Sequence, residues 1–439
     1  MGPEIERKVA NGDIILAFQT WSDKHQWWIP NMNPPDLMLD GVAITPTTHD
    51  FQWYDIPPGN FTQSLPASEI VKLSARKHDM QSGYKNIQYE HLHTLGDNKY
   101  IYPVIIHNSG FFGRQEELGF KYVDQKVFED VQAGRAKIVL IFPLEGFGNL
   151  PDYRDFKILD KWCKDSGLTK DQVFYIHGDF NGPTDVNYTY VPVSAFPCWL
   201  PHPRGTITEF NPTDRKNLFL SYTRRAHDHR LIFTCELIKH NLLDRGVVSY
   251  YGGTALDSEY RVSQKLNRPD LEPYAKILDQ IRPLELDMDL ETNNPAPNIN
   301  YPHYRQTFVS TVLETHHNAS TLFFSEKIWK VMSVGHPFLL IAGMGYLAEL
   351  KKQGYQTFDN WFDESYDTMP NLSDRITCVV NQLVKLSELS TEELIAMRKE
   401  MEPVLKHNHR VFRLHWFNVC QGNPDEYLYL EIKKIWDSF

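Results

Sequence analysis

The chain has 439 residues, which is too long for one small hydrophobic core and predicts two domains of about 200 residues each. Its residues are 41% hydrophobic and 13% aromatic, which excludes a disordered or low-complexity protein. The formal net charge of −11 disfavours a general nucleic-acid binder, because non-specific affinity for nucleic acid comes from Lys and Arg on phosphates. A local basic patch remains compatible with that charge.

The cysteines and the apolar segments indicate the cellular compartment in which the protein is expected. The five cysteines are widely spread and form no CxxC pair, which is typical of reduced thiols in a cytoplasm. The sequence shows no signal-peptide pattern and no run of about 18 apolar residues, the length that a spanning helix needs. We therefore expect a cytoplasmic protein without a membrane span.

The N-terminal half predicts an α/β domain. Four apolar segments predict strands, and the last three run into loops of polar residues and glycine: 13–19, 100–107, 137–142 and 173–177. Functional loops of such domains lie beyond the carboxyl ends of the strands. Residues 196–216 hold four prolines and no periodic pattern, which predicts a linker, so we place the domain at residues 1–205.

The C-terminal half predicts a second α/β domain over residues 206–410. Strands are expected at 217–222 and 247–251, with a helix between them, and helices at 372–388 and 390–407. A final helix at 426–439 lies in a segment, 411–439, that we expect to pack back across the domains.

Residues 306–367 carry the clearest pattern in the chain. A predicted strand at 308–313 ends on Glu314, and Ser325 is a good N-cap for a helix that stops near Gly335. A second strand at 337–341 runs into a glycine-rich turn. Because a helix N-terminus carries unpaired N–H groups and partial positive charge, this helix, with Lys327 in its first turn, suits a diphosphate.

These residues carry a resemblance to a known family. Ser325-Glu326-Lys327, followed by Trp329, Lys330, Gly335 and Pro337, resembles the donor-binding segment of the α1,3-fucosyltransferase and exostosin-like glycosyltransferases, of a phage or bacterial type. The earlier segment 217–252 is similar to the basic segment that opens the same donor domain.

The resemblance implies a GT-B-like fold, in which two Rossmann-like domains face each other across a cleft. It implies a nucleotide-sugar donor bound by the C-terminal domain, inversion at the anomeric carbon, and neither an obligatory metal nor a cofactor. Arg230 and Lys327 would bind the phosphates, with help from Arg225. Glu326 would bind the ribose, and Glu314 would orient nearby donor groups.

The catalytic base is expected in the N-terminal domain at a strand end. Glu145 is the first candidate, because fucosyltransferases have a similar strand-terminal Glu in their acceptor domain. Asp179 is the second candidate and His107 the third.

Two sequence features raise the alternative of a metal site. Asp287-Met288-Asp289 forms the D-x-D pattern that can hold an oxygen-preferring cation, but this short pattern often arises by chance. His227, His229 and the pair 316–317 lack the spacing and cysteine partners of a convincing zinc site. We therefore expect no metal ligands here.

The identity of the acceptor is open, and two rival functions remain. The acceptor is a glycan, a lipid-linked saccharide or a hydroxylated base in phage DNA, and the last of these requires a local Lys/Arg stripe on the N-terminal domain. A different nucleotide-using enzyme is disfavoured, because neither GxGxxG after a strand nor a P-loop occurs. The other rival is a non-catalytic nucleotide-binding or virion-associated protein with a degenerate donor domain.

Overall fold

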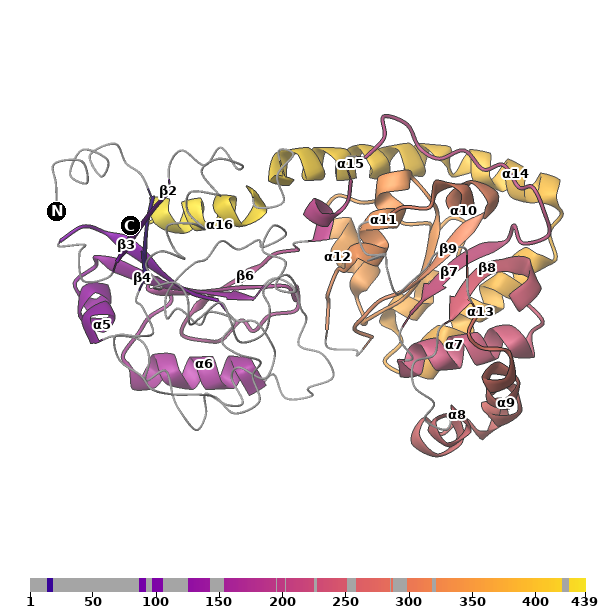
Figure 1. Cartoon of the computed structure of the whole chain (residues 1–439), viewed down its shortest axis with the longest axis horizontal. Coiled ribbons are helices and arrows are strands. Elements are labelled where there is room, and N and C mark those ends of the chain that lie inside the picture. Colours follow the sequence, from indigo (N-terminus) through magenta and orange to yellow (C-terminus); the bar gives the residue numbers. More distant parts are fainter. Residues whose placement is uncertain are drawn as a thin grey trace, which may run out of the picture. The chain divides into compact units, whose positions relative to one another are not determined.

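The chain forms two compact α/β units (Figure 1). Unit 1 comprises Met1–Gly178, Gly182–Cys198 and Val419–Phe439, and unit 2 comprises Asp179–Asn181 and Trp199–Asn418. Each unit contains one parallel sheet, so the α/β class expected from the sequence is confirmed. The computed structural model describes residues 14–18, 87–91, 97–105, 125–142, 154–194, 196–201, 203–224, 227–250, 258–284, 286, 298–317, 321–420 and 426–439.

The sheet of unit 1 has six strands in the order β2-β1-β3-β4-β5-β6, and all neighbouring strands are parallel. Its strands are β1 (Ile14–Phe18), β2 (Ile87–His91), β3 (Tyr100–Ile105), β4 (Ala136–Phe142), β5 (Val173–His177) and β6 (Thr189–Pro192). Its described helices are α5 (Gln125–Gln132), α6 (Arg154–Asp165) and α16 (Glu426–Asp437). Parallel neighbours need crossover connections, as α5 and α6 supply here.

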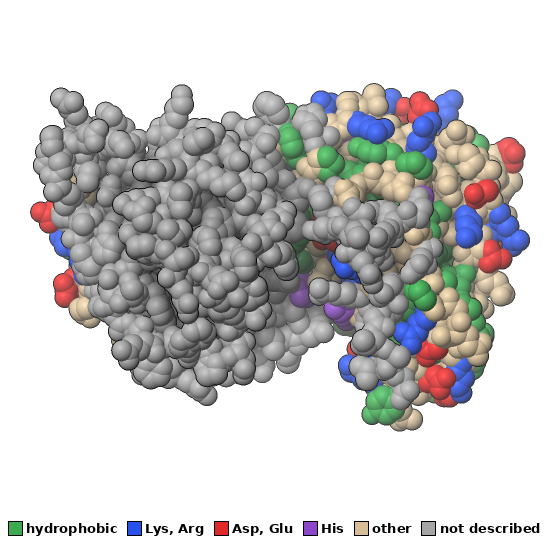
Figure 2. Space-filling model, in the orientation of Figure 1, with side chains coloured by type: hydrophobic (Ala, Val, Ile, Leu, Met, Phe, Trp, Pro, Cys, Tyr) green, Lys and Arg blue, Asp and Glu red, His purple; other side chains and the backbone are tan. Residues whose placement is uncertain are grey.

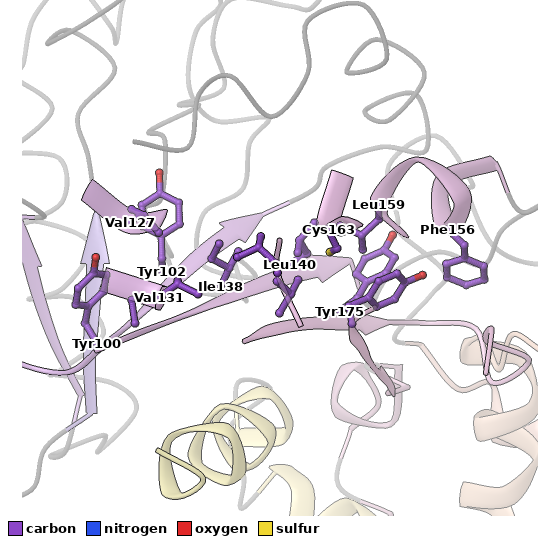
Figure 3. Close-up of a cluster of buried hydrophobic side chains, with 14 residues drawn as sticks. Tyr100, Tyr102, Val127, Val131, Ile138, Leu140, Phe156, Leu159, Cys163 and Tyr175 are labelled. Atoms are coloured by element: carbon purple, nitrogen blue, oxygen red, sulfur yellow. The ribbon is translucent and has the colours of Figure 1, made fainter. Parts of the chain in front are cut away.

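The core of unit 1 follows from side-chain alternation along its strands. Ile138 and Leu140 of β4 lie on the face that α5 and α6 cover, in a cluster with Tyr175 of β5 (Figure 3). Lys137 points to the opposite face, where its ammonium donates to the Ile435 carbonyl of α16 at 3.2 Å. Burial lowers the pKa of Lys137. The sheet is therefore covered on both faces, as parallel sheets require.

The sheet of unit 2 has four strands in the order β10-β9-β7-β8, again all parallel. The strands are β7 (Phe219–Thr223), β8 (Gly246–Tyr250), β9 (Val309–Leu313) and β10 (Phe338–Ile341). The chain runs outward from β7 to β8 and then returns to β9 on the other side. The strand order therefore reverses between β7 and β9, which makes this position the topological switch point of the sheet.

Helices lie on both sides of this sheet, with α7 and α13 on one side and α10 and α11 on the other (Figure 1). The α-helices of unit 2 are α7 (Asp228–Lys239), α8 (Ser258–Tyr260), α9 (Glu272–Ile281), α10 (Tyr301–Gln306), α11 (Glu326–Val334), α12 (Tyr346–Lys352), α13 (Leu372–Ser387), α14 (Thr391–Glu400) and α15 (Glu402–Cys420). No helix in the described part of the chain combines the length and apolar character that crossing a bilayer demands.

The structure differs from the expected elements in a few places. The single helix expected at 390–407 is two helices, α14 and α15, which meet at Met401. Ser390 starts α14 with a capping box to Glu393. Both the expected domain boundary after residue 410 and the boundary between the units after Asn418 lie within α15. Strand β6 has no apolar run that sequence patterns could identify, because its residues are half-buried or exposed and it ends at proline.

Gly335 ends α11 in the left-handed conformation, with φ 63°. The segment expected to be a linker packs against this helix end, because the Thr208 amide donates to the Val334 carbonyl at 2.8 Å. The buried Arg398 guanidinium donates to the carbonyls of Thr208 (3.3 Å) and Gly335 (3.1 Å). A Cβ at Gly335 would collide with the side chain of Ile207.

Gly335→Ala should therefore destabilise the protein through both backbone strain and collision. We expect the free energy of unfolding to fall by about 2–4 kcal/mol in urea denaturation. Gly354→Ala is the matched control, because Gly354 has φ 89° but no atom within 4 Å of a Cβ built there. Its loss should be about 1–2 kcal/mol from strain alone. Equal losses in the two variants would contradict the packing of residue 207 against the helix end.

Candidate functional site

The candidate site lies where β7 and β9 end, at the switch point of the unit 2 sheet. Helix α7 follows β7, and α11 follows β9 after the segment 314–325. In doubly wound sheets the crevice at this position is where ligands bind, because the loops from the two neighbouring strands diverge there. Most residues that the sequence assigns to the donor site belong to these two connections.

Glu314 directly follows β9 and is completely buried. Its Oε1 accepts hydrogen bonds from the Tyr346 hydroxyl (2.8 Å) and the Ser325 amide (3.3 Å). Its Oε2 accepts from the Ser325 hydroxyl (2.5 Å) and the Thr315 amide (3.1 Å). Four donors therefore satisfy both oxygens of this buried side chain. Glu314 thereby connects the end of β9 to the first turns of both α11 and α12.

Ser325 is the N-cap of α11, as the sequence predicts. Its backbone is extended (φ −86°, ψ −178°), and its hydroxyl oxygen accepts a hydrogen bond from the Lys327 amide at 3.3 Å. The same hydroxyl donates to Glu314. The start of α11 is therefore held in place by a side chain from the neighbouring strand end.

Lys327 and Glu326 form an ion pair in the first turn of α11. The Lys327 ammonium lies 2.9 Å from Glu326 Oε1, 3.0 Å from Thr315 Oγ1 and 3.1 Å from Ser325 Oγ. Burial by itself would raise the pKa of Glu326, but the charges of Lys327 and Lys330 outweigh burial and lower that pKa. Burial lowers the pKa of Lys330 to about 8.

Arg230 and His229 reach the same strand end from the first turn of α7. Arg230 is only 4% exposed, and its Nη2 donates to the Leu313 carbonyl at 3.4 Å. The Nε2 of His229 lies 2.8 Å from the Glu314 carbonyl, and because a carbonyl only accepts, Nε2 carries the proton. Together with the contact between Lys327 and Thr315, three consecutive residues at the end of β9 bind basic side chains from two helices.

His229 is buried, and His317 is partly buried. The rings of His229 and His317 stack with centroids 4.1 Å apart. Burial lowers the pKa of His229 well below its usual value and lowers that of His317 to about 4. The Arg375 guanidinium donates to the His317 carbonyl at 2.6 Å. Among the described residues, no group of three or more His, Cys, Asp or Glu side chains is arranged to hold a metal ion.

Asp179 lies in unit 2, whereas the sequence analysis placed it in the N-terminal domain. Its side chain is completely buried, and Oδ1 accepts hydrogen bonds from the amides of Asn181 and Leu322, both at 2.9 Å. These contacts place Asp179 beside the residues that precede Ser325. Its predicted role as a base remains a prediction.

Several predicted site residues lie outside the described residues. These are Glu145, Arg225, His107, Asp287 and Asp289. The structure therefore brings together Arg230, Glu314, Ser325, Glu326 and Lys327 at one strand end.

Sequence reasoning missed Tyr346 and Arg375 as parts of this region. The signal available for Tyr346 was its position as the first residue of a helix after the Gly343–Gly345 turn, at the carboxyl end of the neighbouring strand β10. Arg375 gave no signal, because it reaches His317 from α13, 58 residues further along the chain.

The surface of unit 2 carries mixed charge. On the face in Figure 2, Lys and Arg side chains of the described residues alternate with Asp and Glu side chains. Elsewhere on unit 2, Lys351 pairs with Asp359 (3.0 Å) and Lys352 with Glu349 (3.0 Å). The described residues on the face in Figure 2 therefore form no continuous basic stripe of the kind that phosphate backbones bind.

Comparison with known proteins does not identify a family. No protein-family model matches the sequence, and no curated protein matches it either.

The hydrogen bond from Tyr346 to Glu314 should contribute measurably to stability. Tyr346→Phe should lower the free energy of unfolding by about 1.5–3 kcal/mol, because it removes a buried donor to a charged acceptor. Tyr355→Phe is the matched control, since the buried Tyr355 hydroxyl has no hydrogen-bond partner among the described residues. Its free energy of unfolding should stay unchanged or rise. A loss in Tyr355→Phe as large as that in Tyr346→Phe would contradict this assignment.

Acid should destabilise the protein through the partly buried His317. The pKa of His317 is lower in the folded state, so below pH of about 6.5 the unfolded state binds more protons. Stability from this group is complete above that pH and is lost as the pH falls towards about 4, with a slope of up to about 1.4 kcal/mol per pH unit. Urea denaturation between pH 7 and pH 4.5 should show the loss. His317→Gln should make it smaller, and an unchanged slope in that variant would rule out His317 as a contributor.

Proposed function

We propose that this protein is a glycosyltransferase that moves a sugar from a nucleotide-sugar donor to a hydroxyl acceptor. Unit 2 is the proposed donor-binding domain of a GT-B-like enzyme, and unit 1 is the proposed acceptor-binding domain. The proposed reaction inverts the anomeric carbon and relies on protein cations in place of a metal ion.

One observation carries the proposal: cationic side chains converge on the end of β9 at the switch point of the unit 2 sheet. Arg230 binds Leu313, Lys327 binds Thr315, and Glu314 between them fixes the helix start that carries Lys327. A diphosphate carries several negative oxygens, and a helix N-terminus with flanking cations is the kind of site that binds it. The resemblance of Ser325-Glu326-Lys327 to known donor-binding segments points to the same ligand.

The residues have distinct proposed roles. Arg230 and Lys327, with Arg225, neutralise the donor diphosphate, and Glu326 binds the ribose hydroxyls. The Lys327 ammonium is shared among three oxygens, so diphosphate binding replaces at least one of these contacts by a phosphate oxygen. Glu314 makes no direct contact in this proposal and orients Ser325 and Lys327.

The reaction forms one bond and breaks one. The acceptor oxygen bonds to the anomeric carbon, the bond from that carbon to the diphosphate oxygen breaks, and the acceptor proton passes to a base. The electron pair leaves with the nucleoside diphosphate, whose added charge Arg230 and Lys327 stabilise. Glu145 is the proposed base. The proposed acceptor is a glycan, a lipid-linked saccharide or a hydroxylated DNA base.

A panel of nucleoside diphosphates tests this function. UDP, GDP, CDP, ADP and TDP are each added in a thermal-shift assay, with and without EDTA. One of them should stabilise the protein, and the shift should survive EDTA, because a ligand at 100 times its Kd adds about 2.7 kcal/mol. A shift without turnover of the matching nucleotide sugar would favour a non-catalytic nucleotide-binding or virion-associated protein. No shift with any of the five would refute the donor site.

Substitution of Lys327 tests the assignment of the phosphate site. Lys327→Ala should weaken binding of the stabilising diphosphate by about tenfold to a hundredfold, the value of one or two charge-assisted hydrogen bonds. Lys352→Ala removes the same charge from an exposed position on α12, where Lys352 pairs only locally with Glu349, and should bind as the wild type does. Titration calorimetry gives both affinities. Wild-type affinity in Lys327→Ala would remove Lys327 from the site.

A further inference from the structure

Asp179 has contacts that a base exposed to an acceptor would not have. We propose that Asp179 is a positioning residue that holds residues 321–325 in front of α11, and that it does not act as the base. The expected effect on diphosphate binding rests on the proposed function. The role of Asp179 in holding residues 321–325 rests only on the contacts described below.

The Asp179 carboxylate is engaged by backbone amides. Oδ1 accepts from the Leu322 amide and the Asn181 amide, each at 2.9 Å, and the side chain is 0% exposed. Oδ1 is therefore already occupied as an acceptor by two backbone N–H groups. A general base must come within hydrogen-bond reach of the acceptor hydroxyl, and the Asp179 side chain exposes no surface from which to do so in this structure.

Backbone pairing reinforces this side-chain contact. Asp179 and Phe323 form an antiparallel bridge, and the Phe180 amide donates to the Leu322 carbonyl at 2.8 Å. The rings of Phe180 and Phe324 meet edge to face, with centroids 4.9 Å apart. The segment Asp179–Asn181 thus forms a short strand-like partner for residues 322–324, and we call this arrangement the Asp179 latch.

The latch ends where the proposed phosphate site begins. Phe324 is fully buried and immediately precedes Ser325, whose hydroxyl caps α11 and binds Glu314. Two anchors therefore fix the start of α11: Glu314 from the end of β9 and the Asp179 latch from residues distant in sequence. Loss of the latch would leave the N–H groups of the first turn and Lys327 less well placed for a diphosphate.

Two substitutions distinguish the two possible roles of Asp179, as a latch and as a catalytic base. Asp179→Asn keeps an oxygen that can accept from both amides but removes the ability to take a proton near neutral pH. Asp179→Ala removes both properties. Asp185→Ala is the matched control, because Asp185 is an exposed acidic residue on the same stretch of chain.

Three measurements are made on each full-length variant. Hydrogen–deuterium exchange reports the protection of the amides at 321–327 without any ligand. Calorimetry with UDP, GDP, CDP, ADP and TDP reports diphosphate affinity. Hydrolysis of the corresponding nucleotide sugar reports turnover, with kcat and KM determined separately.

The latch predicts a specific pattern. Asp179→Ala should increase exchange at 321–327 and weaken diphosphate binding by about tenfold or more, because two amides lose their acceptor. Asp179→Asn should restore protection and affinity and keep kcat within about threefold of the wild type, whereas loss of a base costs about a hundredfold or more. Asp185→Ala should match the wild type in all three measurements.

Other outcomes overturn the proposal. Normal affinity with kcat reduced by about a hundredfold in Asp179→Asn would identify Asp179 as the base. Unchanged exchange at 321–327 in Asp179→Ala would show that there is no latch. Increased exchange with unchanged diphosphate affinity would show that the latch orders residues 321–327 but has no effect on diphosphate binding. If Asp179→Ala does not fold, Asp179→Asn decides between base and latch. If the wild type binds none of the diphosphates, the proposed function fails, and exchange alone decides whether Asp179 holds the loop.

Discussion

The arrangement of the candidate site depends on one buried carboxylate, that of Glu314. A polar group is costly to bury without partners, and here both carboxylate oxygens accept hydrogen bonds from donors just after β9 and at the starts of α11 and α12. The buried carboxylate in turn restrains its donors. The donors must stay where they are to keep both oxygens satisfied, so the end of β9 and the starts of α11 and α12 are fixed relative to one another.

Basic side chains near Glu314 donate hydrogen bonds to backbone carbonyls as well as to carboxylates. Arg230 and Arg375 are nearly buried, and both donate to carbonyls at or near the end of β9, on Leu313 and His317. A carbonyl satisfies a guanidinium N–H without neutralising its charge. Positive charge is therefore retained at the switch point of the sheet, while the neutral histidines beside it add none. This positive charge supports the proposal of an anionic ligand.

Local residue patterns identified most of the unit 2 elements that form the site. Gly335 and Ser325 bracket α11 as their propensities require, and Glu314 follows the buried strand β9 at the position where a functional side chain was expected. The role of Asp179 was not readable in the same way. Its position after β5 suggests a strand-end carboxylate available for chemistry, whereas its partners, the amides of Asn181 and Leu322, include one that lies 143 residues away in sequence. Tyr346 and Arg375 were also not predicted, because their partners Glu314 and His317 lie far from them in sequence.

The sequence by itself determined the α/β class and the strands and helices around residues 306–352, because propensity, capping and apolar periodicity are local properties. Only the tertiary structure decided the strand order β10-β9-β7-β8, which brings α7 and α11 to one switch point. It also decided that Glu314 and Asp179 are completely buried and bound by donors. The physical reason is that hydrogen-bond partners far apart in sequence, and the desolvation that makes them matter, exist only once the chain has folded.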